Sequence, residues 1–272
     1  MSQDASGNQG EVDLPALLQQ LERWRHFGAY KLENRVDVLF GVFLPSILGH
    51  AVGVQLKPEI IPEFPFPQEI LLGTKDGSKA TYRCDRIDFA AISNDGSQLF
   101  LVELKTDTAS VRDAQLEKML EVCKERNIGS QSPAMAQEWV ETLLDVAKPA
   151  HTTQTRKYLY ILQVLRNWGL VGSLEEVHKF GWAETRTGLT EALNQAKPAQ
   201  HEEALDHFKD IELVPVLIAP EKDAQLRDPL RQIDFREAAE ALNGLPGEGA
   251  QTFAYCLEQW QRNPAEEPPN AP

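Results

Sequence analysis

The stretch that decides the fold is RIDFAAISNDGSQLFLVELK, residues 86–105, in which two apolar runs flank a short polar segment. The polar segment contains Asp95-Gly96, and Asp-Gly between alternating apolar runs is the strongest short-range signal for a β-hairpin. A type I′ turn at Asp95-Gly96 makes residues pair when their numbers sum to 191. Asp88 then lies opposite Glu103, with Cβ atoms about 5 Å apart. Lys105 follows two residues later and therefore shares their face.

The tripeptide Glu103-Leu104-Lys105 gains its meaning from this setting. Of the 13 lysines in the chain, Lys105 alone has a carboxylate two residues before it. Composition alone produces about two such tripeptides by chance, so the spacing by itself carries little information. At the end of an apolar strand beside Asp88, however, it predicts two carboxylates and a lysine converging at one end of a sheet. That group is typical of metal-dependent phosphodiester hydrolysis, although a solvated salt bridge is the structural alternative.

Composition limits the class of protein. The chain has 272 residues, of which 42% are hydrophobic and 25% are charged, as is usual for one large or two small globular domains. The net charge of −14 is unusual for a protein that binds nucleic acid. Bound divalent cations would offset carboxylates at a site, and net charge does not describe how charge is distributed. The acidic balance thus weakens a nuclease interpretation without excluding it.

Several features predict a soluble, cytoplasmic protein. Three cysteines far apart favour a reducing compartment over a disulfide scaffold. The first 13 residues are polar and acidic and lack the apolar core of a signal peptide. The most apolar run, residues 38–49, is interrupted by Pro45 and is too short to cross a bilayer, so we expect a buried helix and no membrane contact.

The chain reads as one domain, 13–262, between disordered tails at 1–12 and 263–272. Its core covers about 30–219, a helical and irregular insertion covers about 166–210, and two C-terminal helices cover 234–262. Ser110 and Asp113 form a capping box that opens a helix. Apolar periodicity, prolines and caps predict helices at 13–26, 31–48, 110–126 and 133–147, an extended edge strand at 58–66, and strands at 158–165 and 211–218, where Pro215 places the last strand nearer an edge. These elements predict a mixed α/β fold around one sheet.

The order helix, three strands, helix, strand, with Asp88 on the second strand and Glu103-Leu104-Lys105 on the third, resembles the PD-(D/E)XK nuclease superfamily. Ile87 stands where the proline of that name would be, a departure that the family tolerates. The resemblance implies a restriction-endonuclease-like mixed central sheet flanked by helices. It also implies metal-dependent hydrolysis of phosphodiester bonds, with Mg²⁺ as the cofactor and Mn²⁺ as a substitute. DNA is the expected substrate, although the sequence does not distinguish DNA from RNA.

The resemblance and the chemistry of the residue types suggest a role for each side chain. Asp88 and Glu103 would bind the metal, with the Leu104 carbonyl as a third ligand, since hard oxygen ligands suit Mg²⁺. Lys105 would position or deprotonate the attacking water, or offset phosphate charge. By analogy with the family, Gln115 in the following helix and Glu33 near the start of the domain complete the catalytic set.

Two other classes of function stay open. The first is a catalytically silent protein of the same fold that binds nucleic acid or a protein partner. The second is an interaction protein that uses the insertion as its contact surface, as a homodimer or with another chain. Arg156, Lys157 and Arg166 could contact phosphates or be ordinary surface charges, and Trp168 and Trp182 could stack on bases, although core packing is the simpler interpretation.

Overall fold

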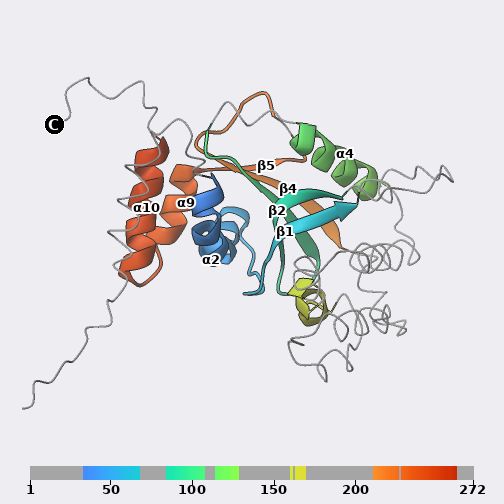
Figure 1. Ribbon diagram of the computed structural model, residues 1–272, viewed down its shortest axis with the longest axis horizontal. Coiled ribbons are helices and arrows are strands. Elements are labelled where there is room, and N and C mark those ends of the chain that lie inside the picture. Colours follow the sequence, from blue (N-terminus) through green and yellow to red (C-terminus); the bar gives the residue numbers. More distant parts are fainter. Residues whose placement is uncertain are drawn as a thin grey trace, which may run out of the picture.

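A five-stranded mixed sheet with helices on both faces forms the centre of the protein (Figure 1). The structure is a computed structural model that describes residues 33–67, 84–107, 114–128, 160–161, 163–169, 211–226 and 228–261. Its labelled elements are α2 (Glu33–Val52), β1 (Ile61–Pro67), β2 (Cys84–Ile92), β3 (Gln98–Leu104), α4 (Ala114–Ile128), β4 (Glu212–Ala219), β5 (Arg231–Asp234), α9 (Phe235–Asn243) and α10 (Glu248–Gln261). The fold is therefore α/β, as expected.

The strands lie in the order β1-β2-β3-β4-β5. β1, β2 and β3 pair antiparallel, whereas β3, β4 and β5 run parallel to one another. β1 lies at the edge of the sheet, as its prolines predict. A proline has no N–H to donate, so it is tolerated in an edge strand but not in a strand that pairs on both sides. Pro215 lies in β4 just before Val216, the first β4 residue that pairs with β5, so the proline is found where β4 has no β5 neighbour.

The predicted register of the β2–β3 hairpin is confirmed by its ladder, in which all four pairs, from Phe89↔Val102 to Ile92↔Leu99, sum to 191. The predicted type I′ turn is wrong. Gly96 has a φ of 76°, but Glu63 is the one described non-glycine residue with a positive φ, so Asp95 lacks the conformation that a type I′ turn requires. A longer loop, 94–97, connects the strands, and the Ser93 N–H donates to the Gln98 carbonyl at 2.9 Å. This loop is centred on the same two residues, so the register is unchanged.

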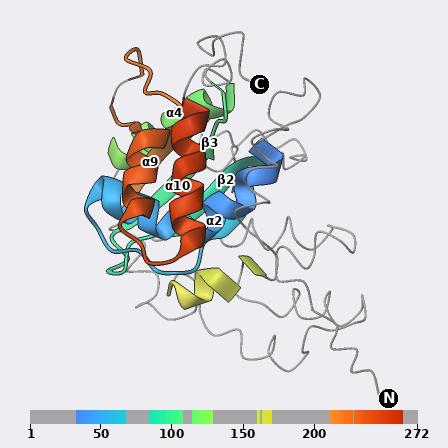
Figure 2. The same cartoon turned by 90° about the vertical axis from the view of Figure 1, so that its left-hand side faces the viewer.

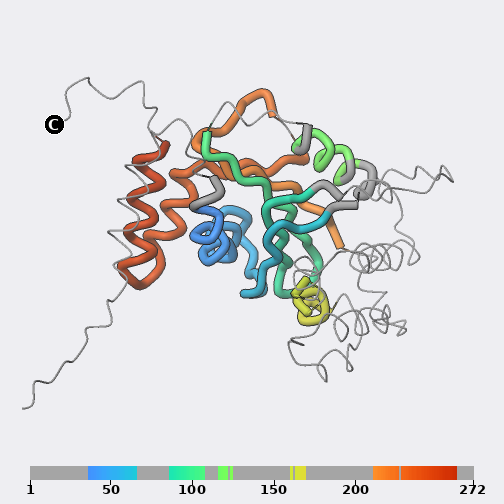
Figure 3. The backbone as a smooth tube through the Cα atoms, in the orientation of Figure 1, coloured from blue at the N-terminus to red at the C-terminus, as the bar shows by residue number. Residues whose placement is uncertain are grey.

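α2 and α9 lie against one face of the sheet, with α10 packed on their outer side against α9, and α4 lies on the other face (Figure 1). In Figure 2, α9 and α10 run side by side in front of the sheet. Figure 3 follows the backbone from α2, near the start of the chain, to α9 and α10, near its end, on the same side of the sheet. The core between these layers is apolar and includes, from the strands, Phe89, Ala91, Phe100, Val102, Leu104, Val216 and Ile218. These are alternate residues, so their neighbours in sequence face α4.

The predicted helices at 31–48, 110–126 and 234–262 correspond to α2, α4 and the pair α9 and α10. Asp234 begins α9 as its N-cap, accepting a hydrogen bond from the Glu237 N–H at 2.8 Å. The short strand β5 was not expected, because four residues carry too little pattern to predict.

The predicted strand at 158–165 is wrong. Residues 160–161 and 163–167 are helical, and Ile161, Val164, Leu165 and Trp168 are the buried positions. Their spacing of three, four and seven residues is the signature of a helix face, which a short apolar run does not distinguish from a buried strand. The fourth strand of the sheet is β4 instead. Trp168 is 4% exposed, which confirms its packing interpretation.

Other expectations lie outside the described residues. They are the tails, the helices at 13–26 and 133–147, the capping box at 110–113, the charges at 156–157, and Trp182 with most of the insertion. Among the described helices, none is both long and apolar enough to cross a membrane.

Candidate functional site

Asp88 and Glu103 occupy neighbouring strands just beyond the last regular pair of the hairpin. Asp88 precedes Phe89 and Glu103 follows Val102, and these two core residues pair across the strands. Strand alternation then places both carboxylates on the opposite face, the face toward α4. Lys105 follows two residues after Glu103 and continues the parallel ladder, because its N–H donates to the Ile218 carbonyl at 2.8 Å.

The carboxylate of Asp88 replaces a backbone acceptor at the end of the hairpin. Its Oδ2 accepts the Leu104 N–H at 2.7 Å. Because the N–H and the carbonyl of one residue in an extended strand point to the same neighbour, the Leu104 carbonyl also points toward β2. The Leu104 side chain lies in the core on the other face. The direct contact between these two expected ligand residues is thus the hydrogen bond from the Leu104 N–H to Asp88, and the ligand role of the Leu104 carbonyl stays a prediction.

Glu103 and Lys105 form a buried ion pair. The Lys105 Nζ donates to Glu103 Oε1 at 2.7 Å, and the side chains are 7% and 2% exposed respectively. The alternative of a solvated salt bridge is therefore wrong for this pair. Charges taken out of water require close partners and hydrogen bonds, and removing one partner leaves the other uncompensated. Asp88 is half-buried and so is the more accessible carboxylate.

The structure does not place the other two expected site residues in this group. Glu33 is the first residue of α2 and Gln115 is the second residue of α4. The side chains of both lie outside the described part of the structure. Their assignment to the site stays a prediction.

The described oxygen donors at this end of the sheet agree with a Mg²⁺ site in number and type, but they do not include a cluster of three metal-binding side chains. Mg²⁺ commonly takes one or two carboxylates from the protein and completes its octahedron with waters and substrate phosphates. Asp88, Glu103 and the Leu104 carbonyl meet that requirement in number and type. No group of three or more histidine, cysteine, aspartate or glutamate side chains that could hold a metal occurs among the described residues.

Two charged residues that the sequence did not single out as site residues border Asp88. Arg86 lies two residues before it on β2 and hence on the same face. Its Nη1 lies 3.4 Å from Oε2 of Glu63, and both side chains are well exposed, at 59% and 61%. The alternation of residues along β2 could have identified Arg86 as a neighbour of Asp88 on the same face of the sheet. No pattern in the sequence identified Glu63 as a neighbour of Asp88, because its position depends on the pairing of β1 with β2.

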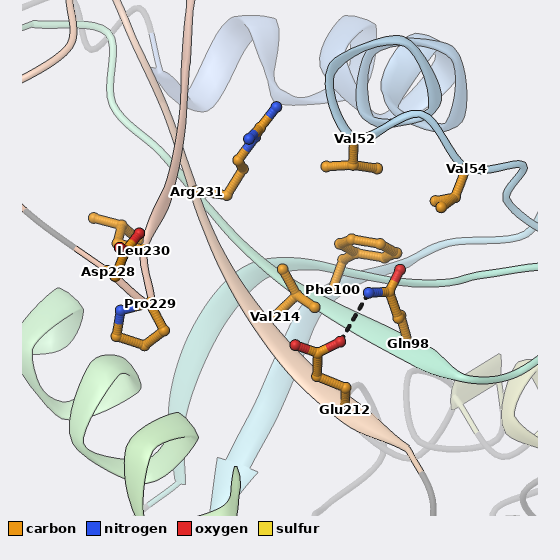
Figure 4. Close-up of a pocket in the computed structure, with 10 residues that line it drawn as sticks. All are labelled: Val52, Val54, Gln98, Phe100, Glu212, Val214, Asp228, Pro229, Leu230 and Arg231. Carbon is orange, nitrogen blue, oxygen red and sulfur yellow. Dashed lines mark hydrogen bonds between the residues drawn. The ribbon is translucent and has the colours of Figure 1, made fainter.

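A cavity of about 270 Å³ lies at the other end of the sheet (Figure 4). Figure 4 shows Val52 and Val54 facing the ring of Phe100, while Gln98 donates to Glu212 at 2.8 Å along one wall. β3 begins at Gln98 and ends at Leu104, so the cavity and the carboxylates are separated by the length of this strand. They are also on opposite faces, and the cavity is no part of the candidate site.

Comparison of the chain with protein-family models, with curated proteins and with solved structures found no match. Any assignment of function consequently rests on the fold and on the residues described above.

Proposed function

We propose that the chain is a metal-dependent nuclease of the restriction-endonuclease-like PD-(D/E)XK group and that it hydrolyses phosphodiester bonds in DNA. The proposal is carried by the hairpin register, which, continued by one pair beyond Phe89↔Val102, sets Asp88 opposite Glu103, and by the hydrogen bond from Lys105 to Glu103. The order α2, β1, β2, β3, α4 supports it, since a helix, three strands and a helix begin the order that the sequence resemblance implies. The strand that follows is β4, after the helical residues 160–161 and 163–167, in place of the expected strand at 158–165. A bound Mg²⁺ would activate water and stabilise the negative charge that develops on the phosphate.

In this proposal the two carboxylates have different neighbours and different tasks. Asp88, the more accessible, is oriented by the Leu104 N–H and faces the arriving phosphate. Glu103 is held in place from inside the protein by Lys105. Because each carboxylate is hydrogen-bonded in position, little reorganisation is needed when a cation binds.

Lys105 supplies a fixed positive charge and orients the attacking water. Its ammonium pairs with Glu103 at 2.7 Å, and a buried ammonium stabilises nearby negative charge more strongly than an exposed one does. We therefore assign to Lys105 the stabilisation of phosphate charge and the orientation of the attacking water, in preference to proton abstraction.

The test is a cleavage assay of the full chain on labelled single- and double-stranded DNA and RNA with Mg²⁺, Mn²⁺ or EDTA. Asp88→Asn is the informative variant, because the Asn oxygen can still accept the Leu104 N–H while the charge is lost. Glu212→Gln is the matched control, since Glu212 is an exposed carboxylate at the other end of the sheet. We expect metal-dependent cleavage of DNA by the parent and by the control, and a loss of about 100-fold or more in Asp88→Asn.

The second candidate is a catalytically silent module of the same fold that binds nucleic acid or a protein partner. The burial of the Glu103–Lys105 pair and the net charge of −14 favour it. Cleavage by no metal form of the parent, together with DNA binding in EDTA, would select this candidate.

A further inference from the structure

Glu63 has an unusual backbone conformation for its place in the sheet. It lies inside β1, between Pro62 and Phe64, which pair with Phe89 and Ile87 of β2. This register places Glu63 opposite Asp88. Its φ is 45°, a left-handed conformation that is strained for a residue with a side chain. Strained residues persist where the surroundings fix them, and they are concentrated at functional sites.

The conformation of Glu63 is accompanied by a contact with Arg86. Glu63 Oε2 lies 3.4 Å from the guanidinium Nη1, and Arg86 shares the face of Asp88. Both side chains are more than half exposed, so water screens the ion pair and its contribution to folding stability is small. Stability therefore does not account for a glutamate held in a strained conformation at this point.

The exposure of the charged side chains falls from Arg86 through Asp88 to Glu103. The Arg86 side chain is 59% exposed, Asp88 is half-buried, and the Glu103 side chain is 2% exposed. A polyanion that approaches from solvent consequently meets the guanidinium first and the carboxylates afterwards. In a chain of net charge −14, a cation at this entrance would offset the repulsion between the carboxylates and a phosphate.

We propose that Arg86 binds a backbone phosphate of the nucleic acid beside the carboxylate site and that Glu63 is its positioning residue. A guanidinium presents five N–H donors in a planar fork that matches two phosphate oxygens, and a contact at one edge limits its orientation. The inference rests on the proposed function, because it identifies the phosphate contact of that same site.

The test measures binding separately from cleavage. Fluorescence anisotropy in EDTA gives the affinity of the full chain for a labelled double-stranded 20-mer at several salt concentrations, and the Mg²⁺ cleavage assay gives KM and kcat. The variants are Arg86→Gln, Arg86→Lys and Glu63→Ala. Arg236→Gln is the matched control, because it removes an exposed guanidinium from α9, on the opposite face of the sheet.

We expect Arg86→Gln to weaken DNA binding about 10-fold and to lower the slope of log affinity against log salt by about 1, as for the loss of one phosphate contact. Arg86→Lys should keep the slope and recover part of the affinity. Glu63→Ala should weaken binding about threefold with an unchanged slope, since the charge of Arg86 remains. KM should rise in all three variants with little change in kcat.

The possible failures are distinguishable. A parent that binds DNA but cleaves nothing overturns the nuclease proposal, while loss of binding in Arg86→Gln still supports the phosphate contact. A parent that cleaves, with Arg86→Gln matching Arg236→Gln in affinity and slope, overturns the phosphate contact alone. A parent that neither binds nor cleaves overturns both.

Discussion

Both ends of the β2–β3 hairpin hold carboxylates by hydrogen bonds, but in opposite surroundings. At the loop, the exposed Asp95 accepts bonds from the Ser93 Oγ at 2.6 Å and from the Ser97 N–H at 3.0 Å, all within five residues. At the strand ends, Asp88 accepts a bond from Leu104, 16 residues away, and Glu103 is buried with Lys105.

The difference shows which end is a candidate site. The loop carboxylate stays in water and shapes a turn, so folding accounts for it. Burying Glu103 and Lys105 carries a desolvation penalty that an apolar pair at the same positions would avoid. The proposed function at the strand ends would account for the charged residues found there.

The largest expected effects come from breaking the buried pair. Lys105→Met leaves Glu103 uncompensated, and we expect a loss of about 3–5 kcal/mol in the free energy of unfolding. Replacing both residues, as Glu103→Leu with Lys105→Met, should recover most of that loss, because an apolar pair avoids the desolvation penalty. Denaturant unfolding of the parent, the single variant and the double variant checks this. Equal stability of all three would show that the pair is not buried as described.

Catalysis should respond differently from stability in the same variants. If Lys105 stabilises charge in the transition state, turnover falls about 10²–10⁴-fold in Lys105→Met, measured at a temperature where the variant is folded. The double variant should regain stability and remain inactive. Lys105→Arg keeps the positive charge and the ion pair, yet the larger guanidinium should restore little turnover. Parent-like cleavage by Lys105→Met would contradict the assigned role.

A smaller effect is expected at the loop end. Hydrogen bonds from Ser93, and next from the backbone and side chain of Ser97, lower the pKa of Asp95 from 3.8 to about 2. A carboxyl group whose pKa is lower in the folded state stabilises the fold above its unfolded pKa, so this contribution is complete above about pH 4 and is lost as the pH falls through 2.

The variant Asp95→Asn should remove that part of the pH dependence, and Glu258→Gln, at an exposed position on α10, is the control. Thermal unfolding of the three proteins between pH 5 and pH 2 makes the comparison. An Asp95→Asn curve parallel to that of the parent would remove Asp95 as the source.

The smallest expected effect concerns the strained backbone at Glu63, where φ is 45°. Glycine adopts this conformation without a steric penalty, so Glu63→Gly should raise the free energy of unfolding by about 1 kcal/mol, and Glu63→Ala should not. Denaturant midpoints of the two variants give the difference. Destabilisation of both by the same amount would argue against strain at this position.

The central hairpin could be predicted from the sequence because its signals are local. Asp95-Gly96 sets the centre of the turn, and alternation sets the faces, so the positions of Asp88 and Glu103 followed even though the turn type was wrong. The cause is geometric, since loops of two and four residues with the same centre give one register.

Other features depend on contacts that a sequence pattern does not contain. The run at 158–165 is apolar and short, and only the burial of Ile161, Val164, Leu165 and Trp168 identifies it as helical. The burial of the Glu103–Lys105 pair requires a neighbouring layer, and the position of Glu63 beside Asp88 requires the pairing of β1 with β2. These are long-range contacts.

The measurement that tests the central claim most directly is calorimetric titration of Mn²⁺ into the parent, Asp88→Asn and Glu103→Gln at neutral pH, with Glu212→Gln as the control. Asp88 and Glu103 would supply two anionic oxygen ligands, with Glu103 oriented by the Lys105 ammonium, so the loss of either carboxylate removes a ligand and its charge from the proposed site. We therefore predict binding by the parent and the control, and affinity lower by about 100-fold or more in each of the other variants. Equal affinity in all four folded proteins, or no binding by the parent, would contradict the claim that the hairpin register builds a metal site.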